Sequence, residues 1–595
     1  MQTFKKLLFL LTLAEKKRFG LLMGMICVMA MLDMFGVASI LPFIAVLTNP
    51  DLVQNNIFLN AAYTKLGFDD TQQFLFALGI LLFVLLLFSL AFKALTTYAQ
   101  LRFTLMREYS IDKRLVEGYL HQPYSWFLNR NSANLGKNIF SEVGLVINNG
   151  FIPLINLIAQ SMVVTALLTL LMFIDTKLTL TIVLALGAAY TIIFKSIQGY
   201  LVRIGSESVK ADQGRFAAIT EALGAFKEVK VGGLEQVYIQ RFSNPALIFA
   251  RRQAIVQVIS QLPRFLIEVI SFGGILLLML YLIVRSSFTS PLPIIALYVF
   301  AGYRLLPALQ QIYAALIQLR FVRPALDALH TDLSSLEPKN LNFKKDIIVL
   351  KQSIILNQIQ YSYPNAPKAA IKNLSLNIPA KSFVGFVGAT GSGKTTVVDL
   401  ILSLLKPQNG TLLVDDQVIT EHNRRAWQRT IGYIPQLIYL ADDTVAANIA
   451  FGFNAKDIDQ EAVERAAKMA NLHDFVVNEM PEQYRTTVGE RGIRLSGGQR
   501  QRIGIARALY HRPQVLIMDE GTSALDNLTE RAVMDALHNA KYESTIILIA
   551  HRLSTVKTCD KIFLLEKGEL KGQGTFDELM QSNQLFQSMV RGSVQ

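Results

Sequence analysis

Six long apolar stretches, separated by polar connections, occupy the first half of the chain. They cover residues 20–47, 73–98, 146–174, 178–200, 255–284 and 291–320. An α-helix needs about 20 mostly apolar residues to cross the hydrocarbon core of a bilayer. The pattern therefore predicts an α-helical transmembrane domain of six spans within residues 1–330.

The pattern changes class in the second half of the chain. Short runs rich in β-branched residues at 383–387, 515–518 and 545–549 alternate with helical patterns at 394–405, 499–510 and 528–540. This alternation predicts an α/β domain with a parallel sheet and with loops at the carboxyl edge of its strands. Residues 331–349 are polar and charged, so we expect a linker there and the α/β domain over residues 350–595.

Positive charge gathers in three of the connections. Lys and Arg are frequent before residue 20, between residues 99 and 145 and between residues 201 and 254, whereas the other connections are short or poor in them. The positive-inside rule places the three basic connections, together with the α/β domain, in the cytoplasm. We expect the two long basic loops to continue the spans as helical stalks, with coupling segments near residues 124–127 and 214–220.

The net charge of +13 follows from the same loops. In a membrane protein, basic loops beside anionic headgroups are a commoner source of such a charge than nucleic-acid binding, so we expect no nucleic-acid partner. Cys27 and Cys559 are the only cysteines, which leaves no disulfide framework or paired-cysteine metal site. Residues 1–18 are expected to form an interfacial helix instead of a cleavable signal peptide.

A phosphate-binding motif lies between the strand predicted at 383–387 and the helix after it. Residues 388–395 read GATGSGKT, which matches the P-loop pattern GxxxxGK[ST]. Glycine amides and the helix N-terminus attract phosphate oxygens, Lys394 reaches the outer phosphates and Thr395 can hold Mg²⁺. The residues expected to bind ATP or GTP here are Gly388, Ala389, Thr390, Gly391, Ser392, Gly393, Lys394, Thr395 and Thr396.

Two carboxylates follow the strand predicted at 515–518. Asp519 is placed to join the Mg²⁺ shell, and Glu520 to polarise the water that attacks the γ-phosphate. A buried strand has no reason to end in two acids unless they face a cation. Capping of the next helix is the structural alternative, and Ser523 or Asp526 fits that role better than Glu520.

A second anion site is predicted at residues 495–499, which read LSGGQ. Ser496, Gly497, Gly498 and Gln499 open a basic helix, and exposed glycine amides at a helix N-terminus suit a γ-phosphate. A simple N-capped helix would explain the serine but not the paired glycines. Beside the P-loop, this motif resembles the ABC ATPases, and the resemblance covers residues 350–580.

The resemblance implies roles for four further residues. Tyr363 is similar to the aromatic residue that stacks on adenine, and Asp526 to the aspartate of the D-loop, which also contacts the nucleotide site. Gln436 is similar to the glutamine that senses Mg²⁺ and the membrane half, and His551 to the switch histidine that contacts the γ-phosphate. The implied catalytic residues are Glu520, His551 and Gln436, and the implied Mg²⁺ ligands are Thr395, Gln436 and Asp519.

The family's divided site also implies an oligomeric state. In ABC ATPases the P-loop and the Ser-Gly-Gly-Gln helix of one domain face away from each other, so a second domain completes each site. A chain with one such domain must dimerise, and its intact motifs favour a homodimer. One mild departure is Gly521, where exporters commonly carry alanine.

Charged residues inside the predicted spans point to the cargo, because such residues are costly in lipid and commonly functional. Lys93 lies towards the cytoplasmic end of the second span, Arg264 in the fifth and Arg304 in the sixth, which suggests an anionic cargo. The alternative is that these cations pair with Asp33 and Glu268 or extend towards the interface, and both explanations stay open.

Five segments from both halves are similar to the bacterial lipid-linked oligosaccharide flippases of protein N-glycosylation. They are residues 33–44, 56–66, 262–264, 303–307 and 433–440. This resemblance implies ATP-driven flipping of an anionic lipid-linked saccharide across the bacterial inner membrane, with Lys93, Arg264 and Arg304 facing the headgroup. Gln311 stands where another basic residue is expected. A multidrug, lipid or peptide exporter is the alternative.

Overall fold

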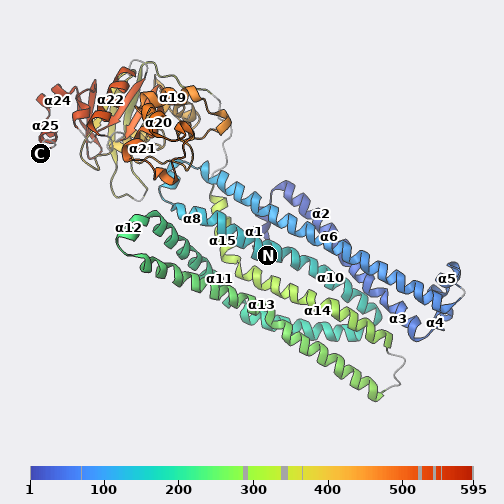
Figure 1. Ribbon diagram of the computed structural model, residues 1–595. Coiled ribbons are helices and arrows are strands. Elements are labelled where there is room, and N and C mark those ends of the chain that lie inside the picture. The colour runs from blue at the N-terminus through green and yellow to red at the C-terminus, as the bar shows by residue number, and fades with distance from the viewer. Residues whose placement is uncertain are drawn as a thin grey trace. The chain divides into compact units, whose positions relative to one another are not determined.

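The computed structural model divides into two compact units, one helical and one α/β (Figure 1). The first unit comprises Met1–Gln122 and Arg130–Lys339, and the second comprises Pro123–Asn129 and Asn340–Gln595. The structure describes residues 2–68, 70–285, 292–336, 346–364, 366–519, 526–540, 544–550 and 553–592. The division assigns the short helix α7 (Tyr124–Phe127), one of the two predicted coupling segments, to the second unit.

The first unit is built from long helices joined by short ones. Its elements are α1 (Gln2–Leu10), α2 (Leu13–Ala38), α3 (Ile40–Thr48), α4 (Leu52–Asn55), α5 (Ile57–Lys65), α6 (Thr71–Leu120), α8 (Ser132–Lys137), η1 (Asn138–Glu142), α9 (Val143–Val146), η2 (Ile147–Phe151), α10 (Ile152–Ile174), α11 (Thr176–Gly224), α12 (Phe226–Val231), α13 (Glu235–Arg285), α14 (Leu292–Phe321) and α15 (Arg323–Ser335).

Three of these helices continue far beyond their apolar stretches. The helices α6, α11 and α13 have 50, 49 and 51 residues, and at 1.5 Å per residue each is roughly 75 Å long. The predicted helical continuation of these apolar stretches is present in all three, and α6 is also one of the helices that could cross a membrane. The helix of the basic loop between residues 201 and 254 is not continuous, because it breaks at Ala225, whose φ and ψ of −109° and 39° are not helical.

The interfacial helix expected over residues 1–18 is also interrupted. The helix α1 ends at Leu10, and Thr12 starts α2 through a capping box with Glu15. Each side chain accepts a hydrogen bond from the other residue's backbone amide, at 3.4 and 2.8 Å. The Thr-x-x-Glu pattern is a helix-start signal, and it explains why the chain begins a new helix at this position.

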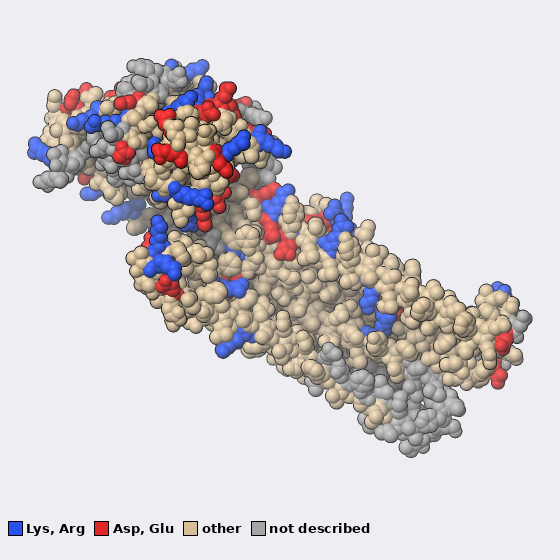
Figure 2. Space-filling model, in the orientation of Figure 1, with Lys and Arg blue, Asp and Glu red and all other residues tan. Residues whose placement is uncertain are grey.

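Three helical stretches in the described part of the chain are long and apolar enough to cross a membrane. They are Leu13–Thr48, Thr71–Leu120 and Leu135–Ile174. A fourth is added if Leu297–Phe321 and Arg323–Ser335, which meet at 53°, are taken as one span. The visible face of the helical unit is accordingly mostly uncharged (Figure 2). These findings support a membrane domain without fixing the count at six.

The second unit contains two sheets and several helices. Its strands are β1 (Ser353–Tyr361), β2 (Ile371–Pro379), β3 (Phe383–Val387), β4 (Asn409–Val414), β5 (Gln417–Val418), β6 (Ile431–Ile434), β7 (Val515–Asp519), β8 (Thr545–Ile549), β9 (Lys561–Glu566) and β10 (Glu569–Gly574). Besides α7, its helices are α16 (Lys394–Ile401), α17 (Arg424–Gln428), α18 (Val445–Ile449), η3 (Ala455–Asp457), α19 (Gln460–Met469), α20 (His473–Glu479), η4 (Gln483–Arg485), η5 (Glu490–Gly492), α21 (Gly497–Leu509), α22 (Asn527–Ala540), α23 (Leu553–Val556), α24 (Phe576–Ser582) and α25 (Gln584–Gly592).

The larger sheet has the strand order β10-β9-β3-β8-β7-β6, and the smaller one has the order β2-β1-β4-β5. Neighbours from β9 to β6 are parallel, so the α/β prediction is confirmed. All residues of β3, β7 and β8 are buried, since alternate side chains enter separate cores on the two faces of the sheet. The loops after β3, β6, β7 and β8 all leave from the same carboxyl edge.

Candidate nucleotide and substrate sites

The P-loop joins β3 to α16 at the carboxyl edge of the larger sheet. Gly388 and Gly393 have φ angles of +156° and +102°. A Cβ atom at Gly388 would overlap the carbonyl oxygen of Leu565, and one at Gly393 would lie 2.9 Å from Cδ1 of Ile371. Glycine is therefore required at both positions, and residues 389–391 form the exposed tip of the loop.

Lys394, the first residue of α16, turns back into the loop. Its ammonium donates to the carbonyl oxygens of Gly388 at 2.8 Å and Ala389 at 3.1 Å, and the residue is only 6% exposed. The buried hydroxyl of Ser392 has no hydrogen-bond partner among the described residues. A cation and an unused hydroxyl thus line the inside of the loop, which suits phosphate oxygens.

Tyr363, the residue expected to stack on adenine, lies beside the first turn of α16. Its hydroxyl is 3.1 Å from the hydroxyl of Thr396. Its ring also packs edge-on against Tyr361, with the ring centroids 5.2 Å apart. The fold therefore brings Tyr363 and Thr396, which are 33 residues apart in sequence, to one side of the P-loop.

The three expected Mg²⁺ ligands come from three elements at the same edge of the sheet. Thr395 is exposed on the first turn of α16, Gln436 is exposed after β6, and Asp519 is 5% exposed at the end of β7. Hydroxyl, amide and carboxylate oxygens suit Mg²⁺, which keeps several waters and uses few protein ligands. Within the described ranges, no cluster of three or more His, Cys, Asp or Glu residues could hold a metal ion.

A second carboxylate, which the sequence analysis did not single out, lies near Asp519. Asp399 is 8% exposed on α16, and burial together with the negative charge of Asp519 raises its pKa to about 6. The only sequence signal is an aspartate inside the otherwise apolar run VVDLI. The described side chains at this edge of the sheet thus include two buried carboxylates, Asp399 and Asp519, and one buried ammonium, Lys394, which leaves an excess of one negative charge.

The Ser-Gly-Gly-Gln motif forms the N-terminus of α21. Ser496 is the N-cap: its hydroxyl accepts from the amide of Gln499 at 3.2 Å, and the Gln499 side chain accepts from the amide of Ser496 at 2.7 Å. Helix capping thus explains both Ser496 and Gln499, whereas the sequence alone suggested that it explains only the serine. Gly497 and Gly498 lie between them and are partly exposed, so their amides remain the candidate anion site.

The remaining predicted nucleotide-site residues follow β7 and β8. Asp526 accepts hydrogen bonds from the amide and the hydroxyl of Thr529, at 2.9 and 2.7 Å, at the start of α22. These bonds are those of a helix cap, the structural role considered for this residue. Glu520, Ser523 and His551 lie outside the described residues.

Comparison with known proteins decides which family these motifs represent. The model of the family described as ABC transporter matches residues 371–523. An ATP-dependent lipid A-core flippase of Cupriavidus metallidurans is 31% identical over 487 residues, covering 80% of each chain. The chain belongs to the ABC transporter family. Its second unit is therefore the ATP-binding domain, an ATPase coupled to transport.

Two further matches describe the transporter's relatives. An ABC multidrug transporter, atrD, of Emericella nidulans is 40% identical over 265 residues, which is 43% of this transporter and 20% of that protein. The solved structure of a bacterial Atm1-family ABC exporter with ATP bound has a TM-score of 0.79 at 22% identity, and covers 98% of each chain. The transporter thus has the exporter fold across both units.

Two of the three cations predicted to face the cargo meet at one carboxylate in the transporter's helical unit. Asp33 on α2 is 3.7 Å from the ammonium of Lys93 on α6 and 3.1 Å from the guanidinium of Arg304 on α14. Ser89 on α6 also donates to Asp33, at 3.0 Å. The pairing with Asp33, weighed as an alternative to cargo binding, is therefore present. Arg264 lies on α13, but its side chain is outside those the structure describes.

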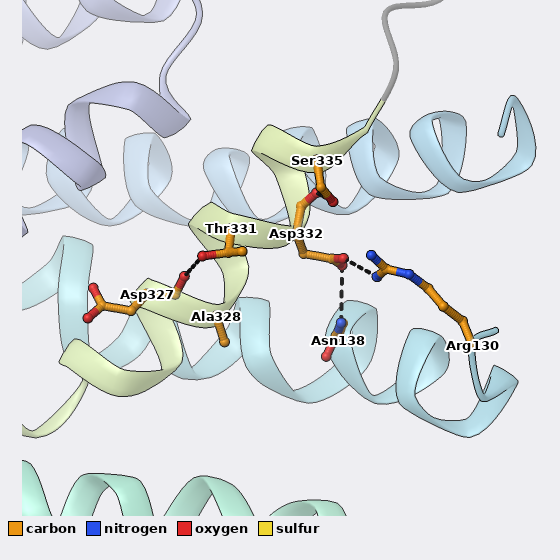
Figure 3. A pocket seen from close by; sticks show the side chains of 7 residues that line it. All are labelled: Arg130, Asn138, Asp327, Ala328, Thr331, Asp332 and Ser335. Atoms are coloured by element: carbon orange, nitrogen blue, oxygen red, sulfur yellow. Dashed lines mark hydrogen bonds and ion pairs between the residues drawn. The ribbon is translucent and has the colours of Figure 1, made fainter. Parts of the chain in front are cut away.

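A pocket of about 490 Å³ lies along α15 in the same unit (Figure 3). Its lining residues are Arg130, Asn138, Asp327, Ala328, Thr331, Asp332 and Ser335. Asp332, which is 8% exposed, accepts from the hydroxyl of Tyr119, from Arg130 at 2.6 Å and from Asn138 at 3.2 Å. Because α15 extends to Ser335, the first residues of the expected linker are helical, and Asp332 anchors them to the second basic loop.

Proposed function

We propose that this transporter is a homodimer that uses ATP to flip an anionic lipid-linked saccharide across the bacterial inner membrane. The observation that carries the proposal is the cluster of Lys93 and Arg304 around Asp33, three charged residues that lie within the apolar stretches 20–47, 73–98 and 291–320. Two cations against one carboxylate leave an excess positive charge. Such a charge is costly within a membrane, and an anionic headgroup is the ligand that would offset it.

The membrane topology that we propose has six spans. The candidates are the helix pair α2 and α3, followed by α6, α10, α11, α13 and α14. Six spans return the chain to its starting side, which agrees with basic loops and the ATP-binding domain in the cytoplasm. Similarity to a bacterial lipid A-core flippase supports a bacterial membrane and a lipid cargo.

The P-loop side chains would bind the phosphates of ATP. The ammonium of Lys394 would exchange its hydrogen bonds to two carbonyl oxygens for hydrogen bonds to the phosphates. Ser392 supplies a buried hydroxyl that has no partner within the described part of the chain. Thr395, Asp519 and Gln436 would hold Mg²⁺, which supplies positive charge that the β- and γ-phosphates share. We assign Glu520 to orienting the attacking water, and His551 and Gln436 to the γ-phosphate region, from their motif positions.

The dimer follows from the division of the family's site between two domains. We propose that the P-loop of one copy and the N-terminus of α21 in the other copy enclose one ATP, with Tyr363 against adenine and Asp526 near the boundary. The amides of Gly497 and Gly498, between the two capping residues of α21, would meet the γ-phosphate. Intact motifs in each copy favour a homodimer with two working sites.

A multidrug, lipid or peptide exporter is the alternative function. The similarity to an ABC multidrug transporter supports it, although that match covers less than half of this chain. The two functions differ in their requirement for negative charge on the cargo. A multidrug exporter should not need the cations of the Asp33 cluster, whereas a flippase for an anionic headgroup should.

Reconstitution in proteoliposomes tests the proposal. We expect ATP to drive flipping of a fluorescent polyprenyl-diphosphate saccharide and expect no flipping of the same saccharide on a neutral lipid. Transport of both lipids at one rate would favour the alternative. Glu520→Gln should retain ATP binding and lose turnover, while the matched control Glu461→Gln, on the exposed start of α19, should hydrolyse ATP normally. Normal hydrolysis in the Glu520 variant would remove its assigned role.

A further inference from the structure

We propose that Asp33 is a built-in counter-anion that competes with the anionic headgroup for Lys93 and Arg304. This inference rests on the proposed function and identifies the residue that sets how strongly the same site holds its cargo. The proposal comes from the contacts of the carboxylate, which no motif predicts.

The carboxylate of Asp33 is buried and unevenly paired. Asp33 is only 1% exposed. Oδ1 accepts hydrogen bonds from Ser89 at 3.0 Å and from Arg304 at 3.1 Å, which joins α2 to α6 and α14. Oδ2 faces the ammonium of Lys93 at 3.7 Å, too far for a hydrogen bond, and it has no hydrogen-bond partner within the ranges the structure describes. One oxygen is thus fully paired and the other is not.

The two cations are more accessible than the carboxylate that they share. The side chains of Lys93 and Arg304 are 39% and 19% exposed, against 1% for Asp33. A ligand that approaches the cluster therefore meets the cations first, with the carboxylate behind them. Among the side chains that the structure describes, two positive charges face one negative charge, so these three residues carry a net charge of +1 and attract anions.

Asp33 limits that attraction in two ways. Its charge repels the incoming anion, and any movement of Lys93 or Arg304 towards the anion leaves a buried carboxylate with fewer partners, which is unfavourable. Binding of the headgroup and the ion pairs between the three helices therefore oppose each other. A transporter must release its cargo after moving it. Asp33 promotes this release because it forms ion pairs with Lys93 and Arg304 again when the anion leaves.

The test compares four proteins in lipid nanodiscs by equilibrium binding of polyprenyl diphosphate, with uncharged polyprenol as the reference ligand. The cluster has a net charge of +1 in the wild type, +2 in Asp33→Asn, 0 in Lys93→Gln and +1 in the double variant. We expect Asp33→Asn to bind the diphosphate about tenfold more tightly and Lys93→Gln to bind it about tenfold more weakly. The double variant should return to near the wild-type affinity, and polyprenol binding should not change.

The outcomes separate this inference from the proposed function. If the wild type prefers the diphosphate but Asp33→Asn binds it no more tightly, the counter-anion role is overturned and the proposed cargo stands. If the wild type binds both lipids equally, the proposed cargo fails and the inference fails with it. Should Asp33→Asn alone not fold, the same question is answered by comparing Lys93→Gln with the double variant, whose net charge equals that of the wild type.

Discussion

The two units of the transporter carry opposite excesses of charge at their candidate sites. In the ATP-binding domain, Asp399 and Asp519 are two buried carboxylates at one edge of the sheet, and the charge of one raises the pKa of the other. In the helical unit, Lys93 and Arg304 are two cations around one buried carboxylate. Each excess indicates the ligand that would offset it, a cation such as Mg²⁺ in the first case and an anion in the second.

The cations of the two units also differ in what holds them. Lys394 donates to two neutral carbonyl oxygens of its own loop, whereas Lys93 and Arg304 face a charged carboxylate from another helix. A phosphate that binds Lys394 replaces carbonyl oxygens of the loop, whereas an anion that binds Lys93 or Arg304 must compete with a carboxylate. The comparison predicts a nucleotide site built for firm phosphate binding and a membrane site built for weaker, reversible binding.

The largest expected effect is the loss of ATPase activity when the P-loop lysine, Lys394, is replaced. Lys394→Met should lower the ATPase rate at least about a hundredfold, because the site loses the cation that stabilises charge on the phosphates during transfer. The measurement is phosphate release by the reconstituted transporter. Lys406→Met is the matched control, since Lys406 is 80% exposed in a surface ion pair with Glu421, and it should keep the normal rate. Comparable rates in the two variants would contradict the assigned role of the P-loop lysine.

A smaller effect is expected at the membrane site. Arg304→Ala should lower ATP-driven flipping of a polyprenyl-diphosphate saccharide about tenfold, because the headgroup loses one of two charged partners. Arg304→Lys should recover part of the rate, as it restores the charge without the guanidinium geometry. Unchanged flipping by the alanine variant, in liposomes where the wild type is active, would show that the cargo does not use this cation.

The sequence was sufficient for the parts of each site that depend on local patterns. The strands 383–387 and 545–549 are found as predicted, because both are apolar runs between clear turn signals. The helix predicted over 394–405 ends earlier, at Ile401, and Ser403 beyond it has a left-handed φ of +52°. The Thr-x-x-Glu pattern at Thr12 is a local signal for the helix start found there, so this boundary too is encoded in the sequence.

The features that escaped prediction depend on contacts between distant segments. Asp399 and Asp519 are 120 residues apart, and only the packing of α16 against the sheet brings their charges together. Ser89 gave no signal, because its function is a hydrogen bond to Asp33 on another helix. Pattern reasoning identifies which residue types a site needs, but the three-dimensional fold decides which of them pair.

A third buried carboxylate sharpens the comparison because its charge is balanced. Asp332 has one cation, Arg130, and two neutral donors, Tyr119 and Asn138. A balanced cluster should stabilise the fold without attracting a ligand. Asp332→Asn should therefore destabilise the helical unit by about 2 kcal/mol, since it removes a charge-assisted hydrogen bond within a buried network. Thermal unfolding in nanodiscs measures this change, and a large loss of diphosphate affinity without loss of stability would contradict it.

The smallest effect concerns the carboxylate pair Asp399 and Asp519, and it depends on pH. The pKa of Asp399 is raised from 3.8 to about 6 in the folded protein, so the folded state holds this proton more tightly than the unfolded state. The ATP-binding domain should therefore lose about 1 kcal/mol of stability between pH 5 and pH 7 without Mg²⁺, as the carboxyl ionises. Asp399→Asn should remove this part of the pH dependence.

Thermal unfolding of both proteins at several pH values, with and without Mg²⁺ and ATP, gives the decisive comparison. A cation near Asp519 offsets the repulsion between the two carboxylates, so adding Mg²⁺ with ATP should reduce the pH dependence of the wild type towards that of Asp399→Asn. If the two proteins share one pH dependence in every condition, the excess of negative charge at this edge of the sheet has no energetic consequence. The ATP-binding domain would then provide no anionic counterpart to the cationic cluster around Asp33.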